Sequence, residues 1–240
     1  MSRGAILSLV LLCGILVVST RAGENARQVF PLSPGTYWVY HGLVRSWMED
    51  STPGNVTAVT WKMSVARVLN RDGVSVAIVN GFPSDLDWSE GQANPQRSML
   101  VGTVDSKFYL NSPWDTSWVA DLIDAPKYPL DELARPYEWI LQLPLTAGER
   151  FGCDEAAAKR QDGKYCWVVG SPSSAELGRV KGVAPGQRQS YEINYDAVSD
   201  DTEIEFVPGV GITSYEYHHH GAIAETELHL VEFHSGDAAR

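Results

Sequence analysis

The sequence contains few cysteines and a single long apolar run, and the length of that run limits what the segment can be. Only three cysteines occur among 240 residues, and a single long apolar run follows Arg3, from Ile6 to Val18. That run is too short to span a bilayer as a helix. Thr20 and Ala22 occupy the −3 and −1 positions of an A-x-A-like cleavage site. We therefore predict a signal peptide over residues 1–22, cleavage near Ala22, a periplasmic or secreted location and no membrane span in the mature chain.

Basic residues are also scarce. The chain has 19 Lys and Arg against 30 Asp and Glu, which gives a formal net charge of −11 with histidines neutral. Removal of the signal peptide takes away Arg3 and Arg21 and no acidic residue, so 17 basic residues remain and the charge becomes −13. An acidic surface of this kind repels nucleic acid and anionic lipid headgroups, and we expect neither as a partner. The 44% hydrophobic content makes disorder implausible.

Common catalytic motifs are absent as well. The sequence has no Gly-x-Ser-x-Gly elbow, no His-Glu-x-x-His, no P-loop and no dinucleotide fingerprint. Three acidic residues, Asp85, Asp87 and Glu90, cluster near Trp88 in a segment without strand character. Paired carboxylates could serve a glycosidase, but we interpret this segment as a solubilising loop. The sequence therefore favours a non-enzymatic protein and leaves an enzyme open.

What the sequence does contain is a series of short extended segments separated by turn residues. Asn70-Arg-Asp-Gly73 is a hairpin signal between two of them. This spacing predicts an all-β fold, an antiparallel meander that forms a curved sheet, a sandwich or a barrel-like structure, with short helical turns around residues 119–142. The strands are expected near Tyr37–Gly42, Val56–Leu69, Val74–Asn80, Ser98–Leu110, Arg150–Cys153, Lys164–Gly170, Ser190–Tyr195, Thr202–Phe206, Ile212–His220 and Ala222–Phe233.

A short echo divides the mature chain into two parts. Phe30-Pro-Leu-Ser-Pro-Gly-Thr-Tyr-Trp38 is similar to Leu143-Pro-Leu-Thr-Ala-Gly-Glu-Arg-Phe151. Each copy would place a turn before the first strand of a lobe, with a glycine at the bend. We predict an N-terminal lobe over residues 23–142 and a C-terminal lobe over residues 143–240. One continuous domain over residues 23–240 is the alternative, and a true duplication and a coincidence both remain open.

Two segments together carry a resemblance to known proteins. They are Pro31-Leu-Ser-Pro-Gly-Thr-Tyr-Trp-Val-Tyr40 and the stretch from Phe206-Val-Pro-Gly-Val-Gly-Ile212 to Tyr215-Glu-Tyr-His-His-His-Gly221. In these segments the chain resembles a group of uncharacterised bacterial secreted or envelope β-sheet proteins. The resemblance implies a bacterial extracytoplasmic location and brings no known activity with it.

Two cysteines, Cys153 and Cys166, remain in the mature chain. They flank an Asp162-Gly163 turn signal, and an oxidising compartment favours their pairing. We predict a structural disulfide. A two-thiol metal site is the alternative, although the spacing lacks a Cys-x-x-Cys and no histidine lies between the two cysteines.

The closing hairpin holds most of the histidines. If His220 and Gly221 form a two-residue turn, Glu216 faces Glu225 on the neighbouring strand, a repulsive pair unless a cation or a basic neighbour intervenes. His218 and His220 point to one face of a strand and could bind a divalent metal such as zinc together with Glu216 or His229. The alternative is an ordinary polar hairpin without any cofactor.

Aromatic residues complete the candidates. Trp38, Trp61 and Trp167 lie in strand patterns and are expected in the core. Trp88, Trp114 and Trp118 lie in loops rich in Pro and Gly, where exposed rings could contact a sugar or an apolar ligand.

The sequence is compatible with three functions. The leading hypothesis is a non-enzymatic secreted or periplasmic binding or envelope-associated module, whose partner is an unknown small molecule, a glycan or an envelope component. The rivals are a metal-binding protein or metal-dependent enzyme that uses the histidine hairpin, and a purely structural interaction domain.

Overall fold

The computed structural model describes residues 29–47, 54–87, 96–103, 105–111, 125–133, 138–220 and 223–236. Nearly all regular structure in these ranges is antiparallel β-sheet, as the sequence predicts. Short helical segments are confined to the 3₁₀ helices η1 (Pro83–Leu86) and η2 (Leu130–Leu133) and the α-helix α3 (Glu155–Ala158). Within the same ranges, no helix has both the length and the apolar character that crossing a bilayer requires.

The first half of the chain forms a meander in which consecutive strands pair. Its strands are β1 (Tyr37–Trp47), β2 (Asn55–Arg71), β3 (Val74–Asn80), β4 (Arg97–Gly102), β5 (Lys107–Asn111) and β6 (Glu138–Gln142). Asp72 and Gly73 have φ values of 52° and 80°, and these positive angles suit the tight hairpin turn that the sequence indicates. One segment departs from expectation, because residues 138–142 form strand β6 rather than a helical turn.

The second half repeats the meander. Its strands are β7 (Arg150–Phe151), β8 (Trp167–Val169), β9 (Ser173–Glu176), β10 (Gln187–Asp196), β11 (Asp200–Val207), β12 (Gly211–His219) and β13 (Ile223–His234). The hydrogen-bonded order is β6-β5-β4-β3-β2-β1-β13-β12-β11-β10-β8-β7, while β9 pairs with β10 beside this path. Because β1 pairs with β13, the two predicted lobes contribute to a single sheet.

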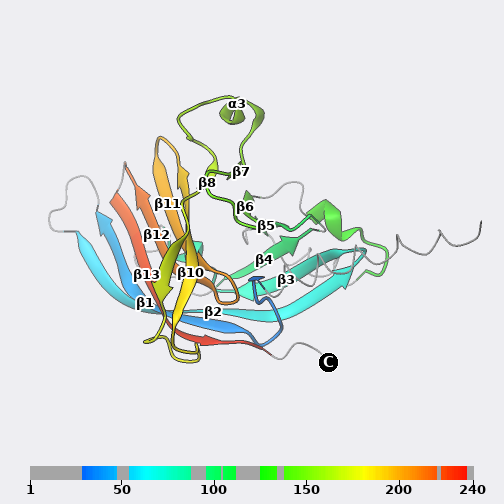
Figure 1. The fold of residues 1–240 in the computed structure, drawn as a ribbon, viewed down its shortest axis with the longest axis horizontal. Helices are drawn as coiled ribbons and strands as arrows, with labels where there is room; N and C mark the ends of the chain where they lie inside the picture. The colour runs from blue at the N-terminus through cyan, green and yellow to red at the C-terminus, as the bar shows by residue number, and fades with distance from the viewer. Residues whose placement is uncertain are drawn as a thin grey trace, which may run out of the picture.

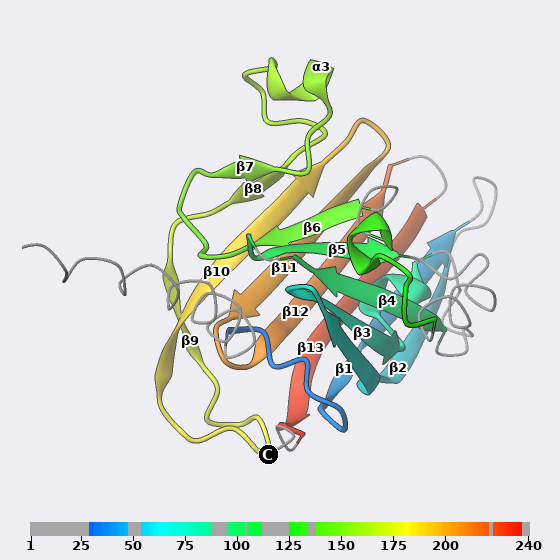
Figure 2. The same ribbon diagram turned by 90° about the vertical axis from the view of Figure 1, so that its right-hand side faces the viewer.

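The sheet curls until it nearly closes on itself. Figures 1 and 2 show its two end strands, β6 and β7, lying close together above the curved floor that β1, β2 and β13 form. The concave side holds the main apolar core, where Trp38 is fully buried and Phe30 packs edge-on against Trp38, Phe108 and Phe206. The predicted core tryptophans are confirmed, since Trp61 and Trp167 are also buried.

The two segments that carry the sequence resemblance lie against each other. Trp38 donates its indole N–H to the carbonyl of Val210 at 2.6 Å, and the Tyr40 hydroxyl donates to the carbonyl of Ile212 at 3.0 Å. Gly209 donates its backbone N–H to the carbonyl of Val29 at 2.7 Å. A buried Trp N–H or Tyr O–H needs such a partner. Polar contacts inside an apolar core therefore hold residues 29–40 against residues 209–212.

The two echo segments form matching turns. Gly35 and Gly148 have φ values of 83° and 80°. The N–H of Gly35 bonds to the carbonyl of Val65 at 2.9 Å, and the N–H of Gly148 bonds to the carbonyl of Val169 at 2.8 Å. Each turn thus joins the start of one strand, β1 or β7, to the next strand, β2 or β8. The geometry agrees with the predicted role of the echo, and duplication stays an interpretation.

Candidate functional site

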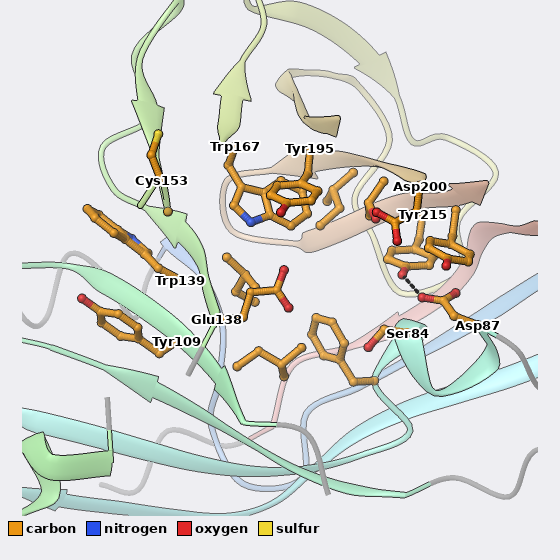
Figure 3. A pocket seen from close by; sticks show the side chains of 17 residues that line it. Ser84, Asp87, Tyr109, Glu138, Trp139, Cys153, Trp167, Tyr195, Asp200 and Tyr215 are labelled. Carbon is orange, nitrogen blue, oxygen red and sulfur yellow. Dashed lines mark hydrogen bonds between the residues drawn. The ribbon is translucent and has the colours of Figure 1, made fainter. Parts of the chain in front are cut away.

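A cavity of about 590 Å³ lies between the two arms of the sheet, which are strands β1–β6 and strands β7–β13. Its walls come from both halves of the chain, so that residues far apart in sequence share one space. Figure 3 shows the labelled side chains arranged around this space, with Glu138 near its middle. The lining residues are Phe82, Ser84, Asp87, Tyr109, Leu110, Glu138, Trp139, Ile140, Gly152, Cys153, Trp167, Tyr195, Asp200, Thr202, Ile204, Tyr215 and Tyr217.

The period of two along the strands explains how these side chains reach the cavity. Successive side chains of a strand point to opposite faces. Asp200, Thr202 and Ile204 on β11 therefore share the inner face, as do Tyr215 and Tyr217 on β12. The histidine hairpin is built from the same strand, β12, and Glu216 and His218 alternate with these tyrosines. The predicted metal ligands on β12 thus face away from the cavity.

Gly152 lets the two ends of the sheet approach each other at the cavity wall. Its φ is +70°, and a Cβ there would lie 2.7 Å from the carbonyl oxygen of Trp139 and 2.9 Å from Cδ1 of Trp167. Only glycine combines this backbone angle with such an approach at low cost. Two aromatic rings from opposite ends of the strand order, on β6 and β8, therefore come to line one space.

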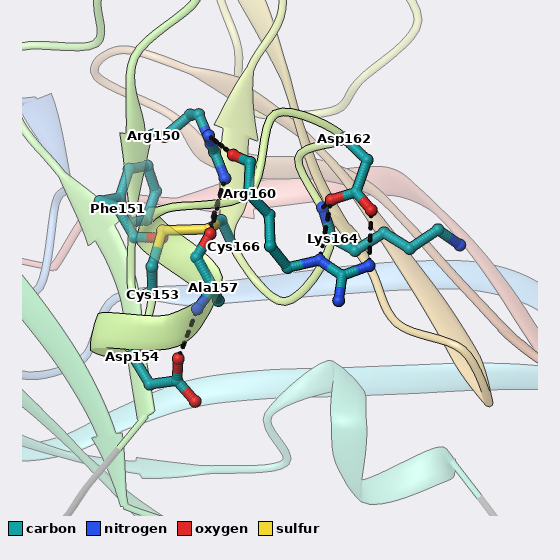
Figure 4. Close-up of a disulfide and its surroundings, with 9 residues drawn as sticks. All are labelled: Arg150, Phe151, Cys153, Asp154, Ala157, Arg160, Asp162, Lys164 and Cys166. Carbon is teal, nitrogen blue, oxygen red and sulfur yellow. Dashed lines mark hydrogen bonds and ion pairs between the residues drawn. A yellow bond between two sulfur atoms is a disulfide. The ribbon is translucent and has the colours of Figure 1, made fainter.

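The disulfide holds this part of the wall, and its predicted pairing is confirmed. Cys153 is bonded to Cys166, which precedes Trp167 at the start of β8. Figure 4 shows Arg150 beside the disulfide, where its guanidinium donates to the carbonyl of Arg160 at 2.7 Å and to that of Ala157 at 3.2 Å. Asp154 caps helix α3 by accepting from the N–H of Ala157 at 2.6 Å.

Asp87 is the most perturbed carboxyl group of the cavity. The Tyr215 hydroxyl donates to its Oδ2 at 2.6 Å, whereas its Oδ1 is buried and has no hydrogen-bond partner among the described residues. Burial raises the pKa of Asp87 well above its ordinary value, and the hydroxyls of Tyr215 and Thr226 act in the opposite direction. Burial and the neighbouring carboxyl also raise the pKa of Tyr215. The interpretation of this acid as part of a solubilising loop is therefore wrong.

Glu138 is the second acid of the wall with a raised pKa. Its side chain keeps accessible surface because it faces the cavity, yet the protein around it displaces enough bulk water to raise its pKa. The negative charge of Asp200, which also lines the cavity, raises that pKa further. Nearby Asp85 accepts from the N–H of Gln96 at 3.0 Å, and burial raises its pKa to about 6.

The aromatic walls form two pairs. The rings of Trp167 and Tyr195 have centroids 5.3 Å apart, and those of Tyr109 and Trp139 lie 6.0 Å apart. Trp167 is only 3% exposed, and its indole N–H has no acceptor among the described residues. An unpaired buried donor of this kind costs about 1–3 kcal/mol. The site therefore combines apolar faces with unfulfilled polar groups.

The candidate tryptophans in loops, Trp88, Trp114 and Trp118, lie outside the described residues. Of the residues that line the cavity, the sequence singles out Asp87 in the acidic segment, Cys153 in the disulfide and Trp167 in the core, and it does not indicate the others. A signal was present at Glu138, which begins a strand with Ile140 on the same face. The prolines on either side of the segment instead favour a helical turn, which would not place Glu138 on the face of a sheet.

The histidine hairpin has a different register from the assumed one. Glu216 faces Glu227, and His218 faces Glu225, so the pairing with a two-residue turn at His220-Gly221 is wrong by two positions and keeps the same faces together. The repulsion expected between acids on this hairpin is offset by a basic neighbour. Arg45 on β1 lies 3.3 Å from Glu225 and 3.5 Å from Glu227.

Three histidines of the hairpin, His218, His220 and His229, each lie close to an acidic side chain. His218 lies 3.9 Å from Glu216 and 3.8 Å from Glu225. His220 lies 2.8 Å from Asp201, and His229 contacts Glu227 and Ser214, both at 3.1 Å. Among the residues with described positions, no three His, Cys, Asp or Glu side chains are grouped so that they could hold a metal ion. Metal binding by His218, His220, Glu216 and His229 stays a prediction.

Zinc can test that prediction directly. Because these imidazoles contact different carboxylates, we expect an excess of zinc to leave the melting temperature of the wild type and of His218→Ala equally unchanged. A true site would stabilise the fold by about 2.7 kcal/mol at a hundredfold excess over the dissociation constant. A zinc-dependent rise that the wild type shows and His218→Ala lacks would establish the metal site.

Comparisons with known proteins give limited information. No protein-family model and no curated protein matches the chain. A predicted lipoprotein of Parabacteroides distasonis has a similar solved structure, with TM-score 0.42, 11% identity, and coverage of 86% of this chain and 98% of that one. A predicted exported protein of Bacteroides fragilis with a YmcC-like fold gives TM-score 0.39, 10% identity and coverage of 86% and 98%.

A third similar structure is that of MucB. Its TM-score is 0.29 and its identity 12%, and the match covers 92% of this chain and 58% of that one. Likenesses of this extent do not constrain what the present chain binds. Its function has to be argued from the cavity.

Proposed function

We propose that this protein is a non-enzymatic, extracytoplasmic binding protein that holds a small ligand in the cavity between the two arms of its sheet. One observation carries the proposal, the cavity of about 590 Å³ with unpaired polar groups in its walls. Its volume falls in the range of ligand pockets, roughly 300–1,000 Å³, which are mostly apolar with a few placed polar groups. The unpaired indole N–H of Trp167 is a polar group that a ligand would satisfy.

The architecture explains why a cavity forms at this place. A sheet that closes with few strands fills its interior with side chains, whereas larger closed sheets enclose ligand cavities. Here β6 and β7 are the two ends of the hydrogen-bonded order, and the cavity is lined by Glu138 and Trp139 on one side and by Gly152 and Cys153 on the other. The site lies where the sheet stops short of closing.

The extracytoplasmic part of the proposal rests on two features. The sequence predicts a signal peptide over residues 1–22, and the fold contains a disulfide between Cys153 and Cys166. Disulfides persist in oxidising compartments and are rare in the cytosol. We propose a glycan or an envelope component as the source of the ligand.

A neutral dye tests the binding function without knowledge of the natural ligand. N-phenylnaphthylamine fluoresces more strongly in apolar surroundings, and we expect a saturable rise when it is titrated into the wild type. Thr202→Trp places a ring inside the cavity and should weaken dye binding about tenfold or more. The matched control is Thr60→Trp on strand β2, where Thr60 is exposed, and it should leave dye binding unchanged.

Two results would contradict the proposal. One is a fluorescence that rises linearly without saturation in the wild type. The other is equal dye binding by Thr202→Trp and the wild type.

A further inference from the structure

The cavity has an unbalanced charge. Asp87, Glu138 and Asp200 line it, and the lining contains no Lys, Arg or His. None of these three carboxyl groups forms an ion pair with a basic residue in the described part of the chain. Two basic residues adjoin the lining: His219 pairs with Asp200 across strands β11 and β12, and the ammonium of Lys107 lies 4.7 Å from the centroid of the Trp139 ring. Acids without cations in a low-dielectric space repel one another and attract a positive ligand.

The aromatic rings strengthen the same preference. Figure 3 shows Glu138 below the Trp167–Tyr195 pair, with the Trp139–Tyr109 pair to its left. The face of an aromatic ring carries negative charge density and attracts an organic cation, most strongly where water is excluded. The ammonium of Lys107 already lies 4.7 Å from the centroid of the Trp139 ring. The Trp167–Tyr195 pair and the carboxyl group of Glu138 are therefore the surroundings that could recognise an added ammonium group.

A second, independent observation points to a ligand. Trp167 is 3% exposed, lines the cavity, and its indole N–H has no acceptor among the described residues. Figure 3 shows the nitrogen of this ring on the side that faces Glu138. A bare metal ion would not accept a hydrogen bond from this donor. The ligand therefore needs an oxygen or nitrogen acceptor in addition to its positive charge.

We propose, on the basis of the binding function above, that the ligand is an organic cation, a protonated amine that also carries a hydrogen-bond acceptor. Glu138 binds the ammonium group, the rings of Trp167 and Tyr195 contact its apolar part, and the indole N–H of Trp167 donates to its acceptor. An anionic ligand such as a fatty acid would meet three carboxyl groups and no compensating cation. A neutral sugar would satisfy Trp167 and leave the acidic groups uncompensated.

Three matched compounds separate these possibilities. Phenylethanolamine, phenylethanediol and mandelate share a phenyl ring and a hydroxyl acceptor, and they differ in carrying a positive, a neutral and a negative group. Isothermal titration calorimetry on the full mature protein at neutral pH should give an affinity for phenylethanolamine about tenfold or more above that for the diol. Mandelate should bind most weakly, and glucose should bind no better than the diol.

Substitutions test which side chain binds the ammonium group of the ligand. Glu138→Gln keeps the volume and removes the charge, and it should reduce the preference for the amine over the diol about tenfold. Glu216→Gln on the outer face of β12 is the matched control and should keep the wild-type preference. Trp167→Phe keeps a ring and removes the N–H, so it should weaken the binding of phenylethanolamine and of phenylethanediol.

The pH dependence gives a further readout. Burial and Asp200 raise the pKa of Glu138, and burial raises that of Asp87. Because the amine requires an ionised acid, its affinity should be highest above these raised pKa values and should fall as pH drops through them. The charge of Asp200 acts on Glu138, and the charge of Glu138 in turn raises the pKa of Tyr195.

Different results would overturn the cation proposal and the binding function. If the neutral dye saturates the cavity while the amine binds no better than the diol or glucose, the cation proposal is overturned and the binding function stands. An unchanged amine preference in Glu138→Gln also overturns it. If neither the dye nor any of the compounds binds, both proposals are wrong.

Discussion

Replacing Gly42 with alanine is expected to destabilise the protein by about 3 kcal/mol or more, the upper end of the usual cost of overpacking. Gly42 lies within β1, where a Cβ would overlap the backbone carbonyl of Glu227 and would also lie 2.9 Å from Cα of Leu228. Both obstacles are main chain, so a side-chain rotation cannot relieve them. Strands β1 and β13 would have to separate, and their pairing is the one that joins the two halves of the sheet.

Urea unfolding followed by tryptophan fluorescence measures this loss. The matched control is Gly178→Ala, because Gly178 has an ordinary backbone angle and a Cβ there would meet no atom within 4 Å. The control should stay within roughly 0.5 kcal/mol of the wild type. Equal unfolding midpoints for the two variants would show that β1 and β13 do not approach each other as closely as described.

Gly42 also illustrates why the extent of the strands was difficult to predict. The sequence suggests that a strand ends at this glycine, whereas β1 continues to Trp47. Glycine is depleted in strands, and for that reason it suggested an end. Within a sheet, however, it can mark a close approach between two backbones, and the neighbour here, β13, lies far away in the sequence. Local patterns carry no information about that neighbour.

Local turn chemistry was the more reliable signal. The Asp72-Gly73 turn follows from residues that accept positive φ, and the predicted strand Val74–Asn80 has the same bounds in the structure. The pairing of Cys153 with Cys166 followed from compartment and spacing. These features depend on short stretches or on a choice among very few partners. An all-β class therefore follows from the sequence, while the closing of the sheet does not.

The cavity was beyond the sequence for a related reason. Its walls come from η1 and six strands, and no spacing of residues along the chain predicts that these elements lie side by side. Trp167 is buried as predicted, but burial alone does not distinguish a filled core from the wall of a cavity. Asp87 was assigned to a solubilising loop because acidic residues between strands usually face solvent. Only the fold shows that Tyr215 of β12 donates to it.

Removing the disulfide is the second change with a large expected effect, a loss of about 3 kcal/mol in the free energy of unfolding. The bond joins residues separated by 13 positions, and much of its effect is attributed to restricting the unfolded chain. The double variant Cys153→Ser, Cys166→Ser should show this loss in urea unfolding. The wild type should show the same loss in a reducing agent, to which the double variant should not respond.

Ligand binding should weaken together with stability, because the disulfide holds Gly152 and Cys153 against the wall that Trp167 completes. Arg150 still ties the loop through the carbonyls of Ala157 and Arg160, so the double variant should fold and bind the neutral dye less tightly. Glu155→Ala is the matched control in the same loop. It breaks an exposed ion pair with Lys159, which contributes little, and should change neither quantity. If the double variant kept the wild-type dye affinity while losing stability, the disulfide would stabilise the fold without shaping the cavity.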